Sequence, residues 1–143
     1  MFLFCRQPEM ISPHTIHVHN YHLDGYGHVN NARYLEFLEE ARWHYFRELG
    51  WHDVLRQIQL VVAHIDIAYR HAAVHDDILL IETNVLSVQS RQLVLRQTVR
   101  LSGSLKVAAL AQVTLMPTQN GKVFRLPENV LADFKDLMIQ ENM

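Results

Sequence analysis

The feature that most constrains the fold is a change of pattern after Leu60. Four segments dense in Val, Ile, Leu and Thr follow one another from that point. They run from Leu60 to Tyr69, from Ile78 to Val88, from Gln92 to Leu101 and from Val107 to Met116. Apolar and polar residues alternate in the third, which is typical of a strand with one face in the core. The connections at Ser90–Arg91 and Ser102–Ser104 are too short for a crossover, so we expect antiparallel hairpins.

A helical pattern precedes these strands. Between Asn31 and Gly50 apolar residues recur at helical spacing, namely Leu35, Leu38, Ala41, Tyr45 and Leu49, with Tyr34, Phe37 and Phe46 beside them. Asn30 or Asn31 can cap the start of this helix, and Gly50 can end it in the left-handed conformation. We expect the charged residues to form a solvated face, namely Arg33, Glu36, Glu39, Glu40 and Arg42.

Two shorter elements complete the expected order. The alternation from Thr15 to Tyr21 predicts a strand, and Pro127 to Gln140 predicts a second, shorter helix. The 143 residues form one expected domain, residues 1–143, with Met1 to Pro13 as a loosely held arm. The fold class is α+β, a five-stranded antiparallel sheet wrapped around one long helix. Several strands are apolar on both faces and the sheet has open edges, so we expect at least a dimer.

Composition excludes several classes of protein. Hydrophobic residues make up 49% and charged residues 20%, as in an ordinary soluble globular domain. The net charge of −2 disfavours nucleic acid as a partner. No aliphatic run approaches the roughly 20 residues that span a bilayer, so we expect no membrane partner. Cys5, the single cysteine, cannot form an intrachain disulfide, and Phe2–Cys5 is too short for a signal peptide. We therefore expect a cytoplasmic protein.

Several catalytic motifs are missing from the sequence. The five glycines form neither a dinucleotide fingerprint nor a phosphate loop. There is no G-x-S-x-G elbow and no H-E-x-x-H helix, which argues against serine hydrolases and zincins. His17 and His19 share a strand face, but no spacing supplies a third ligand, and solvated or hydrogen-bonded surface histidines are the stronger interpretation. We expect no metal and no cofactor.

The stretch from Tyr21 to Tyr34 allows two interpretations. In the structural one, Asp24-Gly25 is a turn dipeptide and an asparagine caps the helix that follows. In the chemical one, glycines let the backbone approach a ligand, and the free N–H groups of the first helical turn hold an oxyanion. Asp24 is the only carboxylate between Glu9 and Glu36, so acid–base or nucleophilic work in this loop falls to it.

A family resemblance favours the chemical interpretation. The pattern Leu23-Asp24-x-x-x-His28-Val29-Asn30-Asn31-x-x-Tyr34, followed by the run Leu35 to Trp43, resembles hotdog-fold acyl-CoA thioesterases of the 4-hydroxybenzoyl-CoA thioesterase type. It is particularly similar to their bacterial long-chain acyl-CoA thioesterase branch. The resemblance spans about Thr15 to Met116. It implies dimers that share a continuous sheet and often form tetramers, so we expect a homodimer at least and a homotetramer as the fuller assembly, with active sites at the subunit interface.

The resemblance also implies residue roles. Asp24 is the expected catalytic carboxylate, and the backbone N–H of Asn31 is expected to polarise the thioester carbonyl. His28 lies in the motif, where it orients the loop, contacts substrate or serves only the structure. Arg70 matches a basic position that could meet a phosphate of coenzyme A. Tyr34 is a candidate substrate-binding residue.

Details of substrate recognition stay open at this level. Tyr34, Phe37 and Trp43 could line a channel for the acyl chain, although aromatic residues at helical spacing usually belong to the core. His71-Ala72-Ala73 stands where close relatives tend to have another basic residue and a proline. The expected activity is hydrolysis of medium- to long-chain acyl-CoA to free fatty acid and CoA, with Asp24 as base or nucleophile. The alternatives are an aryl-CoA or acyl-carrier-protein thioesterase, or a non-catalytic acyl-CoA-binding protein.

Overall fold

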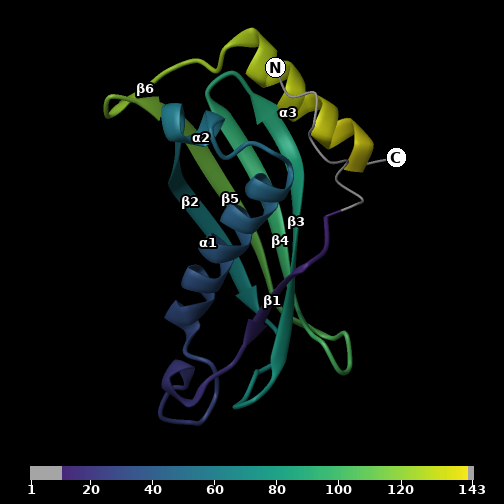
Figure 1. Cartoon of the computed structure of the whole chain (residues 1–143). Helices are drawn as coiled ribbons and strands as arrows, with labels where there is room; N and C mark the ends of the chain where they lie inside the picture. Colours follow the sequence, from purple (N-terminus) through teal and green to yellow (C-terminus); the bar gives the residue numbers. More distant parts are fainter. Residues whose placement is uncertain (1–10, 142–143) are drawn as a thin grey trace.

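A computed structural model describes residues 11–141 of the chain, with side chains described up to Met138. Most of the expected N-terminal arm, Met1 to Pro13, therefore lies outside the described residues. The order of elements within the described range is strand, long helix, strands and C-terminal helix, as Figure 1 shows.

One antiparallel sheet forms the body of the molecule. Its strands are β1 (His14–His17), β2 (Gln59–Tyr69), β3 (Ile78–Gln89), β4 (Gln92–Leu101) and β5 (Val107–Gln119), in the spatial order β1-β3-β4-β5-β2, and the short β6 (Lys122–Val123) pairs with β5. Both expected hairpins are present, between β3 and β4 and between β4 and β5. The four strands expected after Leu60 are confirmed, with β5 extended by three residues at its end.

The first strand is shorter than the alternation predicts. It ends at His17, and the chain then turns into a short 3-10 helix, η2 (Asn20–His22). The reason is a change of hydrogen-bond partners: beyond His17, the Val18 N–H donates to the Asp77 carbonyl (2.9 Å) and the Val18 carbonyl accepts from Asp76 N–H (3.0 Å). The prediction of a strand as far as Tyr21 is therefore wrong.

The long helix α1 (Asn31–Glu48) lies against the inner face of the curved sheet (Figure 1). The Asn30 side chain caps it by accepting from the Ala32 N–H at 2.9 Å. Gly50 follows its end with a φ of 82°, the left-handed conformation that glycine adopts freely. Both expected helix limits are confirmed. An unexpected short helix, α2 (Val54–Gln57), comes next.

The buried face of α1 differs from the expected one. Tyr34, Phe37, Leu38, Ala41, Arg42, Tyr45 and Phe46 are buried. Leu35, expected in the apolar stripe, is 40% exposed, and Trp43 is 43% exposed. Arg42, expected on the solvated face, is only 8% exposed. Its burial is possible because Gln97 on β4 accepts a hydrogen bond from its guanidinium, a partner that spacing within α1 does not reveal.

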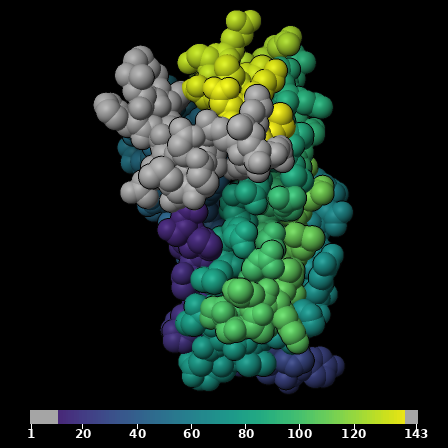
Figure 2. Space-filling view, turned by 90° about the vertical axis from the view of Figure 1, so that its right-hand side faces the viewer, coloured from purple at the N-terminus to yellow at the C-terminus, as the bar shows by residue number. Residues whose placement is uncertain are grey.

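The C-terminal helix α3 (Glu128–Glu141) closes one end of the sheet. Phe134 is buried there, with its ring centroid 4.3 Å from Trp51 and 6.2 Å from Phe46. Figure 2 shows α3 in yellow at the upper end of the molecule, above strands coloured teal and green. At the far edge of the sheet, β5 is the only strand that pairs with β2 within residues 11–141, and β2 exposes Val61 and Val62. None of the helices in residues 11–141 is long and apolar enough to cross a membrane.

Candidate active site

The loop from Leu23 to Val29 is closed by its own backbone and by the carboxylate of Asp24. Leu23 and Val29 form an antiparallel bridge, and the Asp24 N–H donates to the His28 carbonyl at 2.7 Å. Oδ1 of Asp24 accepts from the N–H groups of Tyr26 (2.8 Å) and His28 (3.3 Å). The second oxygen, Oδ2, has no hydrogen bond within the described residues. One oxygen therefore holds the loop while the other is free for a ligand.

This loop is fixed against the start of α1. The Asn30 N–H donates to the His22 carbonyl (2.8 Å), and the Val29 N–H donates to the Ala73 carbonyl (2.9 Å). Two separate segments thus hold the two residues that lead into the helix. The N–H of Asn31 makes no hydrogen bond within the described residues, and Asn31 is exposed. A free donor at the positive end of an 18-residue helix can stabilise a developing negative charge.

His22 anchors the other end of the loop as a neutral imidazole. Its Nδ1 accepts from the His19 N–H at 2.9 Å, and its ring meets Phe37 edge-on with centroids 4.9 Å apart. Burial lowers the pKa of His22, and the nearby Arg33 and His19 act in the same direction. A neutral ring keeps Nδ1 free to accept.

Tyr69, at the end of β2, also contacts the helix start. Its hydroxyl donates to the carbonyl oxygen of Asn31 at 3.0 Å. Tyr69 is not among the site residues that the sequence predicts. The alternation along β2 could have indicated its position. Tyr69 shares a strand face with Ile65 and Ile67, and both isoleucines are half-buried. Arg70 follows Tyr69, so it lies near the helix start. Its side chain is exposed and its N–H donates to Ala108.

Tyr34 lies in the core of the single chain, with 3% of its surface exposed. Burial raises its pKa to about 12, with Tyr69 and Asp77 acting in the same direction and a hydrogen bond with the Ala73 backbone opposing them. Its hydroxyl is therefore neutral at physiological pH and cannot act as a base. Contact between Tyr34 and substrate stays a prediction.

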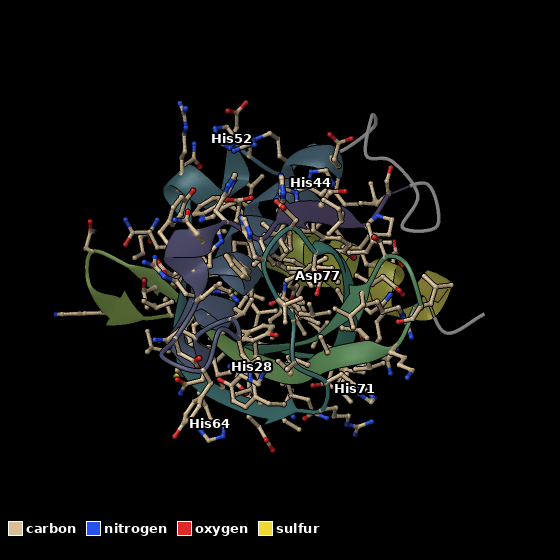
Figure 3. The ribbon with its side chains drawn as sticks, turned by 90° about the horizontal axis from the view of Figure 1, so that it is seen from below. His28, His44, His52, His64, His71 and Asp77 are labelled. Carbon is tan, nitrogen blue, oxygen red and sulfur yellow. The ribbon has the colours of Figure 1, made fainter. Side chains whose placement is uncertain are left out.

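His28 contributes backbone rather than side-chain contacts to the loop. Its imidazole is exposed, while its N–H and carbonyl both bond to Asp24. In Figure 3, which views the molecule from below, His28 lies in the same half of the picture as His64 and His71, while His44 and His52 lie in the other half. The described residues include no group of three or more His, Cys, Asp or Glu side chains placed to hold a metal ion.

Two hollows in the described part of the chain lie elsewhere. One is a groove of about 580 Å³ between the second half of α1, α2 and the start of β2. The other, of about 280 Å³, lies between β3 and the segment before β1. Neither is lined by Asp24, Asn31 or Arg70. In the single chain these three residues are gathered at one end of the molecule, outside both hollows.

Comparisons with known proteins identify the family of the chain. Residues 18–134 match the thioesterase-like superfamily. Long-chain acyl-CoA thioesterase FadM of Escherichia coli (strain K12) is 41% identical over 104 residues, which cover 71% of this chain and 78% of FadM. Acyl-CoA thioesterase YbgC of Haemophilus influenzae is 31% identical over 118 residues, which cover 80% of this chain and 87% of YbgC.

Solved structures agree as well. YbaW, a probable thioesterase from Escherichia coli, is 36% identical with a TM-score of 0.76 over 90% of this chain and 98% of its own. A thioesterase from Thermus thermophilus, crystallised with coenzyme A and Zn, is 24% identical with a TM-score of 0.77 over 92% and 95%, a likeness of fold. The chain therefore belongs to the thioesterase-like superfamily and has its hotdog fold.

Proposed function

We propose that this protein is an acyl-CoA thioesterase that hydrolyses medium- to long-chain acyl-CoA to free fatty acid and CoA. The observation that carries the proposal is the Asn31 N–H at the start of α1, which has no partner among residues 11–141. It lies next to a loop whose Asp24 has one carboxylate oxygen without a hydrogen bond in the same range. The names of the relatives FadM and YbgC support the substrate class.

The chemistry needs a donor and a carboxylate in the same place. Attack on a thioester builds negative charge on the carbonyl oxygen, and a fixed N–H at a helix start stabilises that charge without reorganisation. In our proposal Asn31 N–H is this donor. Oδ2 of Asp24 either removes a proton from the attacking water or attacks the acyl carbon itself to form an anhydride that water then hydrolyses. In both routes the C–S bond breaks, and CoA leaves as a thiolate that takes up a proton. His28 holds the loop through its backbone.

The first prediction concerns Asp24. Over a panel of acyl-CoA chain lengths, read by release of free thiol, we expect turnover with a medium- or long-chain optimum. Asp24→Asn should lower the rate about a hundredfold or more. The variant should stay folded, because an amide oxygen can still accept from the N–H groups of Tyr26 and His28. Asp53→Asn is the matched control, since Asp53 is exposed and its side chain makes no capping bond.

Three other results of the acyl-CoA panel would change the assignment. Turnover by Asp24→Asn close to that of the wild type removes Asp24 from the mechanism. Tight binding of acyl-CoA without thiol release from any chain length supports a non-catalytic binding protein. A strong preference for aryl-CoA or for acyl carrier protein moves the assignment to those thioesterases.

The second prediction isolates the Asn31 N–H. Proline is favoured at the first position of a helix, and Asn30 already has the extended ψ of 134° that a residue before proline adopts. Asn31→Pro should therefore keep the helix and delete the donor, lowering kcat about a hundred- to a thousandfold. Asn31→Ala keeps the N–H and should retain most activity. Equal rates for the two variants, both with wild-type circular dichroism, contradict the assignment.

The third prediction concerns Arg70. We propose that its exposed guanidinium binds a phosphate of coenzyme A near the helix start. Arg70→Ala should raise KM for acyl-CoA about five- to tenfold, the loss of one charge-assisted hydrogen bond. It should leave KM for the matching acyl-pantetheine, which has no phosphate, unchanged. Arg91→Ala, at the exposed β3–β4 turn, is the control. Equal effects on both substrates rule out a phosphate contact.

We also propose a homodimer at least, and a homotetramer as the fuller assembly, in the cytoplasm. The free edge of β2 and the exposed Val61 and Val62 support a second copy paired along this strand. Leu35 and Trp43 expose further apolar surface on α1. A single cysteine and a coenzyme A substrate support the cytoplasm.

A further inference from the structure

The first turn of α1 is held from outside the helix by a side chain that the proposed reaction does not use. Tyr69, the last residue of β2, donates from its hydroxyl to the carbonyl oxygen of Asn31 at 3.0 Å. The two residues are 38 positions apart in the sequence. Asn31 is also the residue whose N–H is the oxyanion donor in the proposed function. The Tyr69 hydroxyl therefore bonds directly to the residue that carries the donor.

The contact from Tyr69 fixes the second side of Asn31. On the first side, the Asn30 N–H donates to the His22 carbonyl at 2.8 Å. The N–H of Asn31 itself has no partner within residues 11–141, so its direction depends on how the backbone on either side is held. A carbonyl oxygen has two lone pairs, so that of Asn31 can serve the helix and also accept from Tyr69. Without the Tyr69 hydroxyl, only the helix itself would hold this second side.

Tyr34 supports the ring of Tyr69 from the core. The two rings meet at 63° with their centroids 5.4 Å apart, the edge-to-face arrangement that aromatic pairs favour. Tyr34 is buried, and the Ala73 backbone forms a hydrogen bond with its hydroxyl. The Ala73 carbonyl in turn accepts from the Val29 N–H at 2.9 Å. The two tyrosines thus connect the end of β2 to the same segment that holds the residues leading into α1.

The Tyr69 hydroxyl is in the protonation state that this contact needs. Burial raises the pKa of Tyr69 above the ordinary value of a tyrosine, about 10, so the phenol is protonated at physiological pH. A protonated phenol donates to a carbonyl oxygen, whereas a phenolate has no proton to donate. The hydroxyl therefore acts on the helix start as a neutral donor.

We propose that Tyr69 is a positioning residue for the oxyanion donor, which acts by holding the first turn of α1 through the Asn31 carbonyl. The inference rests on the proposed function, because that function assigns the Asn31 N–H to the thioester carbonyl oxygen. A displaced donor stabilises the transition state less well, while the bound substrate in its ground state loses little. Loss of the hydroxyl should therefore lower kcat and leave KM nearly unchanged.

Tyr69→Phe removes the hydroxyl and keeps the ring that packs on Tyr34. With the acyl-CoA that the wild type hydrolyses fastest, kcat should fall about tenfold while KM stays within about twofold. Tyr21→Phe is the matched control, because Tyr21 is exposed and its hydroxyl makes no hydrogen bond within the described residues. It should keep the wild-type kcat. Incorporation of 4-aminophenylalanine at position 69 retains a donor at the end of the ring and should restore most of the lost kcat.

A double-mutant cycle shows whether Tyr69 acts through the donor. Asn31→Pro deletes the N–H, so Tyr69→Phe should lower kcat in the wild type and have no further effect in the Asn31→Pro background. A loss of similar size in both backgrounds overturns the proposal, because Tyr69 then acts on substrate or at another place. A raised KM with an unchanged kcat overturns it too and makes Tyr69 a binding residue. So does a wild-type kcat in Tyr69→Phe.

The same cycle separates this inference from the proposed function. If Asn31→Pro keeps the wild-type kcat, the assignment of the donor is itself wrong and the inference fails with it. If Asn31→Pro lowers kcat as expected and Tyr69→Phe does not, only the inference is wrong. Should Tyr69→Phe not fold, 4-fluorophenylalanine at position 69 takes its place in the cycle, because fluorine fills nearly the space of the hydroxyl and donates no hydrogen bond.

Discussion

The structure depends on how the start of α1 is held. Two backbone hydrogen bonds, from Asn30 to His22 and from Val29 to Ala73, fix the residues that lead into the helix. The Asn30 side chain then satisfies the N–H of Ala32, and the N–H of Asn31 is left without a partner among the described residues. A helix that began one residue earlier or later would present a different donor. The geometry of the proposed oxyanion site is therefore set by capping and by the Ala73 segment together.

Asp24 shows why the two interpretations of its loop are compatible. The structural one is correct for Oδ1, which closes the turn over Tyr26 and His28. Such a bond also fixes the orientation of the carboxylate, which a catalytic base or nucleophile needs. A turn residue and a reactive residue are thus the same side chain, with one oxygen used for each purpose.

Local pattern was sufficient for much of the fold and for part of the site. The start of α1, its end at Gly50 and the strands after Leu60 follow from capping, glycine conformation and alternation, which are properties of neighbouring residues. The end of β1, the burial of Arg42 and the contact of Tyr69 with Asn31 were not predictable in this way. Each depends on a partner far along the chain, namely Asp77 for Val18, Gln97 for Arg42 and Asn31 for Tyr69.

Helix α1 thus has one exposed and one buried polar feature. At its start, an exposed N–H faces the loop of Asp24, and in its second half a buried guanidinium faces an apolar groove. In our proposal the first of these serves the thioester.

The central claim is that Asn31 N–H and Asp24 meet at one carbonyl group. The most direct measurement is a crystal structure with an acyl-CoA analogue in which a methylene replaces the sulfur and the carbonyl is retained. The account predicts that the carbonyl oxygen lies about 3 Å from the Asn31 nitrogen, with Oδ2 of Asp24 facing the carbonyl carbon directly or through one water. An analogue bound with its carbonyl remote from both groups would contradict it.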